Sequence, residues 1–232
     1  MEPLLLLPGL LCDQRVFAAQ LIAFRQARSF AGYGLADSLP DMARIVVAQA
    51  PPRFALLGHS MGARVALEIM RVAPERITRL ALVSTGTHLP REGEAEKRHA
   101  LRDLGRNDGM DALVAEWLPP MFAAAHANDE RIVSPLRQMC VEAGLAVFEA
   151  QISALLRRPE VESLLPDIRC PALIAVGRED RWSPPEQHEA IAAHLPHARS
   201  VVIEGAGHML PAEAPDELNA EIARWLDQPA RQ

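Results

Sequence analysis

The pentapeptide Gly58-His-Ser-Met-Gly62 contains the residue types that point most directly to chemistry in this chain. The short apolar run 54–57 before it predicts a buried strand, and the uninterrupted run after it predicts a helix. On the tight turn between two such elements, glycines leave room for neighbouring backbone, and the serine hydroxyl projects from the end of the sheet. The pattern therefore predicts Ser60 as a nucleophile, the alternative being a structural serine in a turn.

A serine hydroxyl attacks a carbonyl group only when a base accepts its proton, and His208 is the candidate for that base. It lies in the segment Glu204-Gly-Ala-Gly-His, directly after the last predicted strand. The glycines before it favour a turn that directs the imidazole toward Ser60. The alternative is a histidine in a surface loop. We expect His59, inside the pentapeptide, to be packed rather than catalytic.

The base in turn needs a carboxylate on its other ring nitrogen, and Gly177-Arg-Glu-Asp180 follows the predicted strand 172–176. Asp180 is the preferred candidate. Glu179 remains open, because adjacent residues of a turn can both reach the imidazole. The segment Ser84-Thr-Gly-Thr, after the preceding strand, offers no carboxylate, which favours the region of Asp180.

Six short apolar runs separated by helical patterns must position these side chains. Such continuous runs are typical of strands buried on both faces of a parallel sheet, and the alternation with helices predicts an α/β fold of six parallel strands. The run 27–31 is the weakest, and we expect it at an exposed edge. The runs are residues 4–7, 27–31, 54–57, 80–83, 172–176 and 200–203.

One long segment interrupts this alternation. No strand pattern occurs from about Thr87 to Pro166, where the sequence predicts amphipathic helices that include 109–117 and a longer one around 135–156. The prediction is a core formed by residues 1–86 and 167–232, with residues 87–166 as a helical cap over the ends of the strands, where ligands bind in such folds.

Composition excludes several classes of function. With 24 basic and 30 acidic residues, the net charge of −6 does not favour nucleic acid as a partner. The three cysteines are far apart in the chain, which predicts reduced thiols. Neither the cysteines nor the eight histidines have the spacing of metal ligands, so we expect no metal, and we expect no cofactor. The acidic residue Glu2 and the break at Pro8-Gly9 argue against a secretory signal, and no apolar run approaches the ~20 residues that span a membrane. We expect a cytoplasmic enzyme with a small-molecule substrate; its oligomeric state stays open.

Together, GHSMG, GRED and EGAGHMLPAEAP resemble the motifs of the α/β-hydrolase family, and the resemblance covers nearly the whole chain. It implies an oxyanion hole formed by the backbone N–H groups of Leu10 and Met61. The family has a His-Gly turn where this chain has Pro8-Gly9, which raises the question of what holds the turn. The family also places a two-stranded hairpin before the first predicted strand, and we expect it to be absent because only three residues precede Leu4.

The resemblance extends to small carboxylesterases and to 3-oxoadipate enol-lactone hydrolases. It implies a serine hydrolase that cleaves a carboxylic ester or lactone, with an acyl group of small to medium size, through an acyl-enzyme on Ser60. Related alternatives are C–C bond hydrolysis, lyase chemistry and acyl transfer. An alternative of another class is a small-molecule receptor that retains the three residues.

The substrate pocket should draw its walls from the helical segment. A pocket role for His88 follows from its place near the strand ends, and bulky side chains there either pack between helices or cover the site. The arginines of this segment are expected on a solvated face, or one of them binds a substrate carboxylate. The pocket candidates are His88, Trp117, Met121, Phe122 and Trp182.

Overall fold

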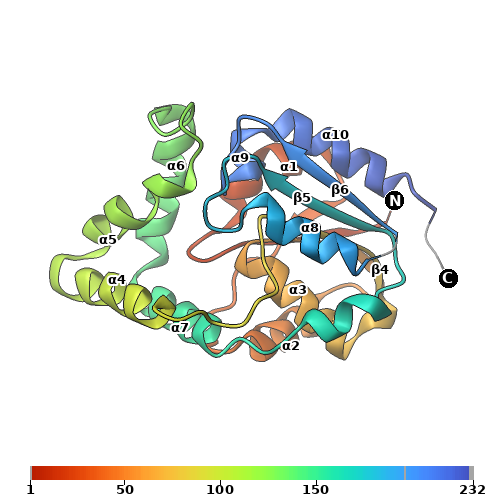
Figure 1. Cartoon of the computed structure of the whole chain (residues 1–232), viewed down its shortest axis with the longest axis horizontal. Helices are drawn as coiled ribbons and strands as arrows, with labels where there is room; N and C mark the ends of the chain where they lie inside the picture. The colour runs from red at the N-terminus through yellow and green to blue at the C-terminus, as the bar shows by residue number, and fades with distance from the viewer. Residues whose placement is uncertain (1, 196, 230–232) are drawn as a thin grey trace.

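The computed structural model describes residues 2–195 and 197–229, and its centre is a sheet of six parallel strands (Figure 1). The strand order is β2-β1-β3-β4-β5-β6, and every neighbouring pair is parallel. The predicted α/β fold with six parallel strands is therefore confirmed. The strands are β1 (Leu4–Leu7), β2 (Ala27–Ser29), β3 (Phe54–His59), β4 (Ile77–Val83), β5 (Ala172–Gly177) and β6 (Ala198–Ile203).

The burial of each strand follows its place in the sheet. Every residue of β1, β3, β4 and β5 is buried, which is why most of their positions are apolar in the sequence, although β4 also contains Thr78 and Arg79. The two edge strands, β2 and β6, each have exposed positions. The weak run 27–31 lies at the edge, as predicted, and forms only three residues of strand.

Helices cover both faces of the sheet. Helices α1 and α10 pack on one face, while α2, α3 and α8 lie on the other (Figure 1). Helix α3 begins directly after Ser60, so the nucleophile candidate sits at the junction of β3 and α3. These helices are α1 (Ala18–Ala23), α2 (Leu39–Gln49), α3 (Met61–Val72), α8 (Pro185–Ala193), α9 (Leu210–Glu213) and α10 (Pro215–Leu226), with short 3₁₀ turns at Gln14–Phe17, Pro74–Arg76, Pro119–Met121 and Glu162–Asp167.

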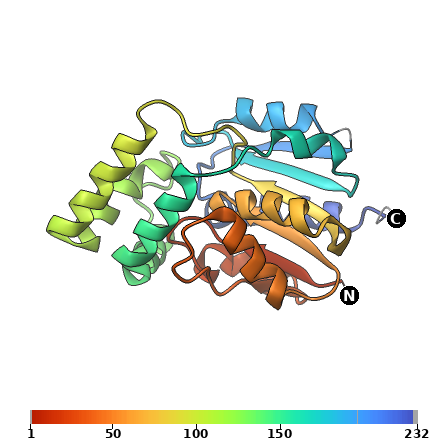
Figure 2. The ribbon, with the colours of Figure 1, turned by 90° about the horizontal axis from the view of Figure 1, so that it is seen from below.

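Four helices lie between β4 and β5 in the chain and project beyond one end of the strands (Figure 2). They are α4 (Glu94–Asp108), α5 (Met110–Trp117), α6 (Glu130–Ala143) and α7 (Leu145–Leu156). The expectation of one long helix around 135–156 is wrong, because this segment belongs to two helices, α6 and α7, with a bend of 89° between them. Gly144 between them has a φ of +83°, a left-handed conformation that favours glycine.

The described helices are short or polar compared with a helix that spans a membrane. None of them alone has the length and apolar composition that crossing a membrane requires, whereas α6 and α7 meet both criteria only when taken together across their bend.

Candidate active site

Ser60 lies on a sharp turn at the end of β3. Its φ of +55° is in the left-handed region, which non-glycine residues rarely adopt. Close backbone packing explains the flanking glycines. A Cβ atom at Gly58 would lie 2.4 Å from the Cα of Ala63, and one at Gly62 would lie 2.1 Å from the carbonyl oxygen of Leu7. The pentapeptide therefore forms the strained strand–turn–helix that its sequence predicted.

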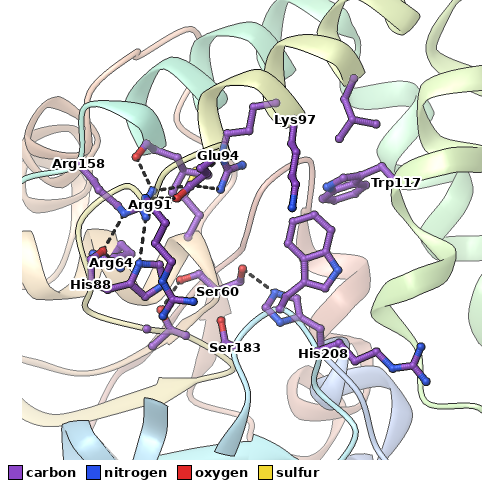
Figure 3. A pocket seen from close by; sticks show the side chains of 18 of the residues that line it. Ser60, Arg64, His88, Arg91, Glu94, Lys97, Trp117, Arg158, Ser183 and His208 are labelled. Atoms are coloured by element: carbon purple, nitrogen blue, oxygen red, sulfur yellow. Dashed lines mark hydrogen bonds and ion pairs between the residues drawn. The ribbon is translucent and has the colours of Figure 1, made fainter. Parts of the chain in front are cut away.

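The side chain of His208 meets that of Ser60 at the end of the sheet (Figure 3). The Ser60 hydroxyl donates a hydrogen bond of 2.8 Å to His208 Nε2. His208 is only 4% exposed, and its loop is fixed by a 2.7 Å hydrogen bond from its own N–H to the carbonyl of Met121. The candidate nucleophile and the candidate base thus lie within proton-transfer distance.

Asp180 completes the hydrogen-bonded chain. Nδ1–H of His208 donates to both carboxylate oxygens of Asp180, at 3.0 and 2.9 Å. The N–H groups of Trp182 and Ser183 donate to the same carboxylate, at 2.9 and 2.8 Å. Burial alone would raise the pKa of this carboxyl, but its attraction to His208 and these hydrogen bonds prevail, so the pKa lies below its usual value.

Glu179, the competing carboxylate, points elsewhere. Its Oε2 accepts the N–H of Ala124 at 3.0 Å, in the segment between α5 and α6. The structure therefore brings Ser60, His208 and Asp180 together and leaves Glu179 outside that chain of hydrogen bonds.

The turn after β1 approaches Ser60 closely. A Cβ atom at Gly9 would lie only 3.1 Å from the Cβ of Ser60, so glycine permits this approach. A cavity of about 10 Å³ lies between them, lined by Leu10, Ser60 and His208 among others, which is the space of about one water oxygen. Within the described residues, no acceptor pairs with the N–H of Leu10 or of Met61.

Three contacts hold the turn in which proline replaces the family histidine. The buried Tyr33 hydroxyl donates to the carbonyl of Pro8 at 3.0 Å, and Cys12 N–H donates to the carbonyl of Gly9 at 3.1 Å. Leu11 has a φ of +57°, and its N–H donates to Gln151 Oε1 of α7 at 2.8 Å. A side chain of the helical insertion therefore fixes the turn next to Ser60.

A larger cavity of about 450 Å³ opens beside Ser60 and His208. Three of the five pocket candidates line it, namely His88, Trp117 and Trp182. Met121 lines the small cavity, and Trp117 lines both cavities. Phe122 is buried but lines neither of them, so its assignment to the pocket is not supported by its position.

Two buried histidines support the loops of the site. His59 is packed, as expected: its Nε2 donates to the carbonyl of His208 at 2.8 Å, and burial lowers its pKa to about 4. His188 lies on α8, and its side chain is buried. Its Nε2 accepts the N–H of Thr85 at 2.9 Å, and burial lowers its pKa to about 4.

Glu213 is a supporting residue that the sequence analysis did not identify. Its carboxylate accepts the N–H of Gly207 at 3.1 Å and that of Ala123 at 2.7 Å, which joins the His208 loop to the segment after α5. Burial raises the pKa of Glu213. The signal was an acidic residue among apolar ones, five positions after His208. In the described part of the chain, no three His, Cys, Asp or Glu side chains are placed to hold a metal ion.

Two curated proteins illustrate the similarity of this chain to known hydrolases. The chain is 27% identical over 175 residues to the (E)-2-((N-methylformamido)methylene)succinate hydrolase of Acinetobacter baylyi, a match that covers 74% of this chain but only 64% of that protein, less than two thirds. It is 28% identical over 206 residues to a pimeloyl-[acyl-carrier protein] methyl ester esterase of Xanthomonas oryzae pv. oryzae, covering 84% of this chain and 80% of that one.

A solved structure and a family profile also resemble this chain, and both belong to hydrolases. The structure of a thermophilic esterase from Thermogutta terrifontis, with malate bound, has a TM-score of 0.87 and 27% identity, covering 97% of this chain and 89% of that one. The sequence profile of the alpha/beta hydrolase family matches residues 4–221. This match covers nearly all of the described strands and helices, and we conclude that the chain is an enzyme of the alpha/beta hydrolase family.

Proposed function

We propose that this enzyme is a serine hydrolase that cleaves a carboxylic ester or lactone through an acyl-enzyme on Ser60. The observation that carries the proposal is the continuous hydrogen-bonded chain from Ser60 Oγ through His208 to Asp180, beside a cavity. The esterase relatives support carboxylic ester chemistry. The substrate is a small molecule with an acyl group of small to medium size, in keeping with the cavity volume of about 450 Å³.

Each group of the site has a role in the proposed reaction. Ser60 Oγ attacks the ester carbonyl while His208 Nε2 accepts its proton, and the Asp180 carboxylate orients the imidazole and stabilises the imidazolium. The N–H groups of Leu10 and Met61 donate to the oxyanion that forms. His208 then returns the proton to the leaving alcohol. Water attacks the acyl-enzyme in the second half, with His208 as base, and the acid is released.

The insertion has a role in the same proposal. We assign residues 87–166 as a cap that closes the cavity and limits access of water. Support comes from the cavity lining, because Leu101 of α4, Trp117 of α5 and Phe148 of α7 face the same space as Ser60. Excluding bulk water strengthens the hydrogen bonds to a developing oxyanion.

The test is a Ser60→Ala variant assayed with p-nitrophenyl esters of rising acyl length and with lactones. We expect loss of turnover with every substrate and loss of covalent labelling by a fluorophosphonate probe, because the nucleophile is removed. Ser163→Ala is the control, since Ser163 is exposed and lies outside both cavities. Turnover or labelling that persists in Ser60→Ala would contradict the proposal.

A further inference from the structure

The walls of the larger cavity are unequal in charge. Two acidic residues, Glu92 and Glu94, face six cations there, although the whole chain has a net charge of −6. We propose that this basic wall binds an anionic group, a carboxylate or phosphate, carried by the ester at a distance from its scissile carbonyl. The inference rests on the proposed function and names its substrate class. The cations are Arg64, Arg91, Lys97, Arg98, Arg158 and Arg181.

At the back of the wall, one carboxylate is shared by two guanidinium groups. Arg158 donates to both oxygens of Glu94, at 2.6 and 2.7 Å, and Arg98 lies 2.9 Å from the same carboxylate. Burial would raise the pKa of Glu94, but the hydrogen bonds from Arg158 and the charge of Arg98 prevail and lower it to about 2. Glu94 therefore stays ionised, and this group of three residues has a net charge of +1.

Arg64 adds a second buried positive charge without a carboxylate partner. It is 5% exposed and lies one helical turn after Ser60, and it donates to the carbonyls of Thr87 and His88 at 3.0 and 2.6 Å. In the described residues, no carboxylate forms a salt bridge with it. Burial and then the charge of Arg158 lower its pKa to about 9, so it remains protonated at neutral pH.

The hydrogen bonds of Arg64 reach only neutral carbonyls, and the charges of Glu94 and Glu162 nearby offset its burial only in part, since its pKa stays lowered. A buried cation of this kind gains from an anion that compensates it. Two carbonyl contacts leave N–H groups of Arg64 free to donate, and a guanidinium group suits the two oxygens of a carboxylate or phosphate. Because Arg64 lines the cavity with Ser60, the anion would share one space with the scissile bond.

The rim of the cavity carries two more cations. Arg91 and Lys97 are exposed, both line the cavity, and neither side chain has a hydrogen bond or ion pair within the described ranges. In Figure 3, Arg64, Arg91 and Arg158 lie on one side of Ser60, while His208, Trp117 and Lys97 lie on the other, so the two rim cations stand on opposite sides of the cavity. Two unpaired rim cations can contact an incoming anion without first breaking a salt bridge.

This arrangement fixes the orientation of the proposed substrate. The ester carbonyl lies between Ser60 and His208, and the anionic group lies toward Arg64. A short aliphatic linker would pass along the apolar side chains of Leu101 and Leu155, which also line the cavity. Monoesters of dicarboxylic acids have this form, with a neutral ester at one end and a carboxylate at the other.

The first test compares kcat/KM for monoesters of dicarboxylic acids with kcat/KM for neutral alkanoate esters of the same chain length. We expect the anionic esters to be preferred at least about tenfold, a preference that falls as salt is added. Matched esters ending in phosphate form a second series, and the favoured series identifies the anionic group. Equal or lower kcat/KM for both anionic series would overturn the inference.

The second test locates the preference on the rim. Lys97→Met and Arg91→Met should each reduce the ratio of anionic to neutral kcat/KM, mainly through KM, by about three- to tenfold. Arg102→Met is the matched control, because Arg102 is on the same helix as Lys97, pairs with Asp103 and does not line the cavity. An unchanged ratio in both rim variants, or an equal fall in the control, would overturn the assignment.

The outcomes separate this inference from the proposed function. Loss of all ester turnover in Ser60→Ala, together with no anionic preference in the wild type, would overturn the basic subsite alone. A further assay measures whether glutarate or inorganic phosphate slows covalent labelling by the fluorophosphonate probe, with neutral butyramide as the control. Protection by an anion in a protein that turns over no ester would retain the subsite and overturn the hydrolase proposal.

Discussion

Asp180 and Glu179 are neighbours in the chain, yet their carboxylates contact different parts of the molecule. Asp180 is 2% exposed and accepts Nδ1–H of His208, whereas Glu179 accepts the N–H of Ala124 on the far side of the turn. Sequence patterns left both open, because the choice depends on which way each side chain leaves a tight turn. The three-dimensional structure decides it through the N–H groups of Trp182 and Ser183, which fix Asp180.

Asp180→Asn tests this assignment. The amide keeps the size of the side chain but loses the charge that stabilises the imidazolium, and its NH₂ group replaces one of the two acceptor oxygens, which favours the wrong imidazole tautomer. We expect kcat for ester hydrolysis to fall by about 10³- to 10⁴-fold with little change in KM. Steady-state kinetics measure the effect.

Glu179→Gln is the matched control, an equivalent change at the adjacent position. Because Glu179 contacts no part of the Ser60–His208 pair, this variant should keep kcat within about threefold of the wild type. A larger loss in Glu179→Gln than in Asp180→Asn would assign the acid role to Glu179.

At the scale of elements, helix α7 and the turn after β1 are joined by one hydrogen bond. Gln151 is 4% exposed, and its Oε1 accepts the N–H of Leu11, whose φ of +57° is unusual for a leucine. The neighbouring amide, that of Leu10, is the proposed oxyanion donor. The helical insertion therefore helps to position a group of the active site as well as lining its cavity.

Gln151→Leu should disturb this turn. The variant leaves the Leu11 N–H without an acceptor, which costs about 1–3 kcal/mol of unfolding free energy, and it loosens the adjacent donor. We expect kcat to fall about tenfold or more while KM changes little, because an oxyanion donor acts mainly in the transition state. Denaturant unfolding and steady-state kinetics measure the two effects.

Two further variants separate a positioning role from a general loss of stability. Gln151→Glu retains an oxygen acceptor and should restore part of kcat. Gln138→Leu alters an exposed glutamine of α6 whose side chain donates a hydrogen bond to Glu142. This variant should change neither kcat nor the free energy of unfolding. If Gln151→Leu lost stability with unchanged kcat, Gln151 would be structural only.

Sequence patterns predicted the elements better than the contacts between them. The runs 4–7, 54–57 and 172–176 are strands because burial on both faces demands continuous apolar residues. The glycines of the pentapeptide likewise predicted the tight turn on which Ser60 lies, since such a turn leaves no room for a Cβ atom at Gly58 or Gly62. The break at Gly144 escaped prediction because a helical apolar pattern continues across a single glycine. The contacts of Gln151 join residues far apart in the chain, which no local pattern reveals.

At the scale of the whole molecule, two neutral histidines join the loops at the ends of the strands. His59 donates to the backbone of the His208 loop, and His188 of α8 accepts the N–H of Thr85, which follows β4. Burial lowers the pKa of each from 6.5 to about 4, with the neighbouring His208 adding to this effect and Asp180 opposing it. Both histidines are therefore uncharged in the folded protein at neutral pH.

These pKa values predict how stability depends on pH. A histidine whose pKa is lower in the folded state binds more protons when unfolded, so stability is lost as the pH falls from about 6.5 toward 4. Each histidine contributes on the order of 2–3 kcal/mol of unfolding free energy to this loss. Glu213 acts in the opposite direction, because its raised pKa makes the folded protein bind more protons. Carboxyl groups with lowered pKa values begin to add their loss below about pH 5.5 and add most of it below about pH 4.5.

The measurement is urea unfolding at several pH values between about 7 and 5.5, a window in which the histidines dominate the loss. His188→Gln is the informative variant, because the glutamine oxygen can accept the Thr85 N–H without titrating. We expect it to lower the slope of unfolding free energy against pH by about a third to a half, since His59 and His88, whose pKa values burial also lowers, keep contributing. His194→Gln, at an exposed position where α8 ends, is the control and should keep the wild-type slope. A slope unchanged in His188→Gln would mean that the buried imidazole of His188 does not resist protonation, and that acid sensitivity in this window arises elsewhere in the fold.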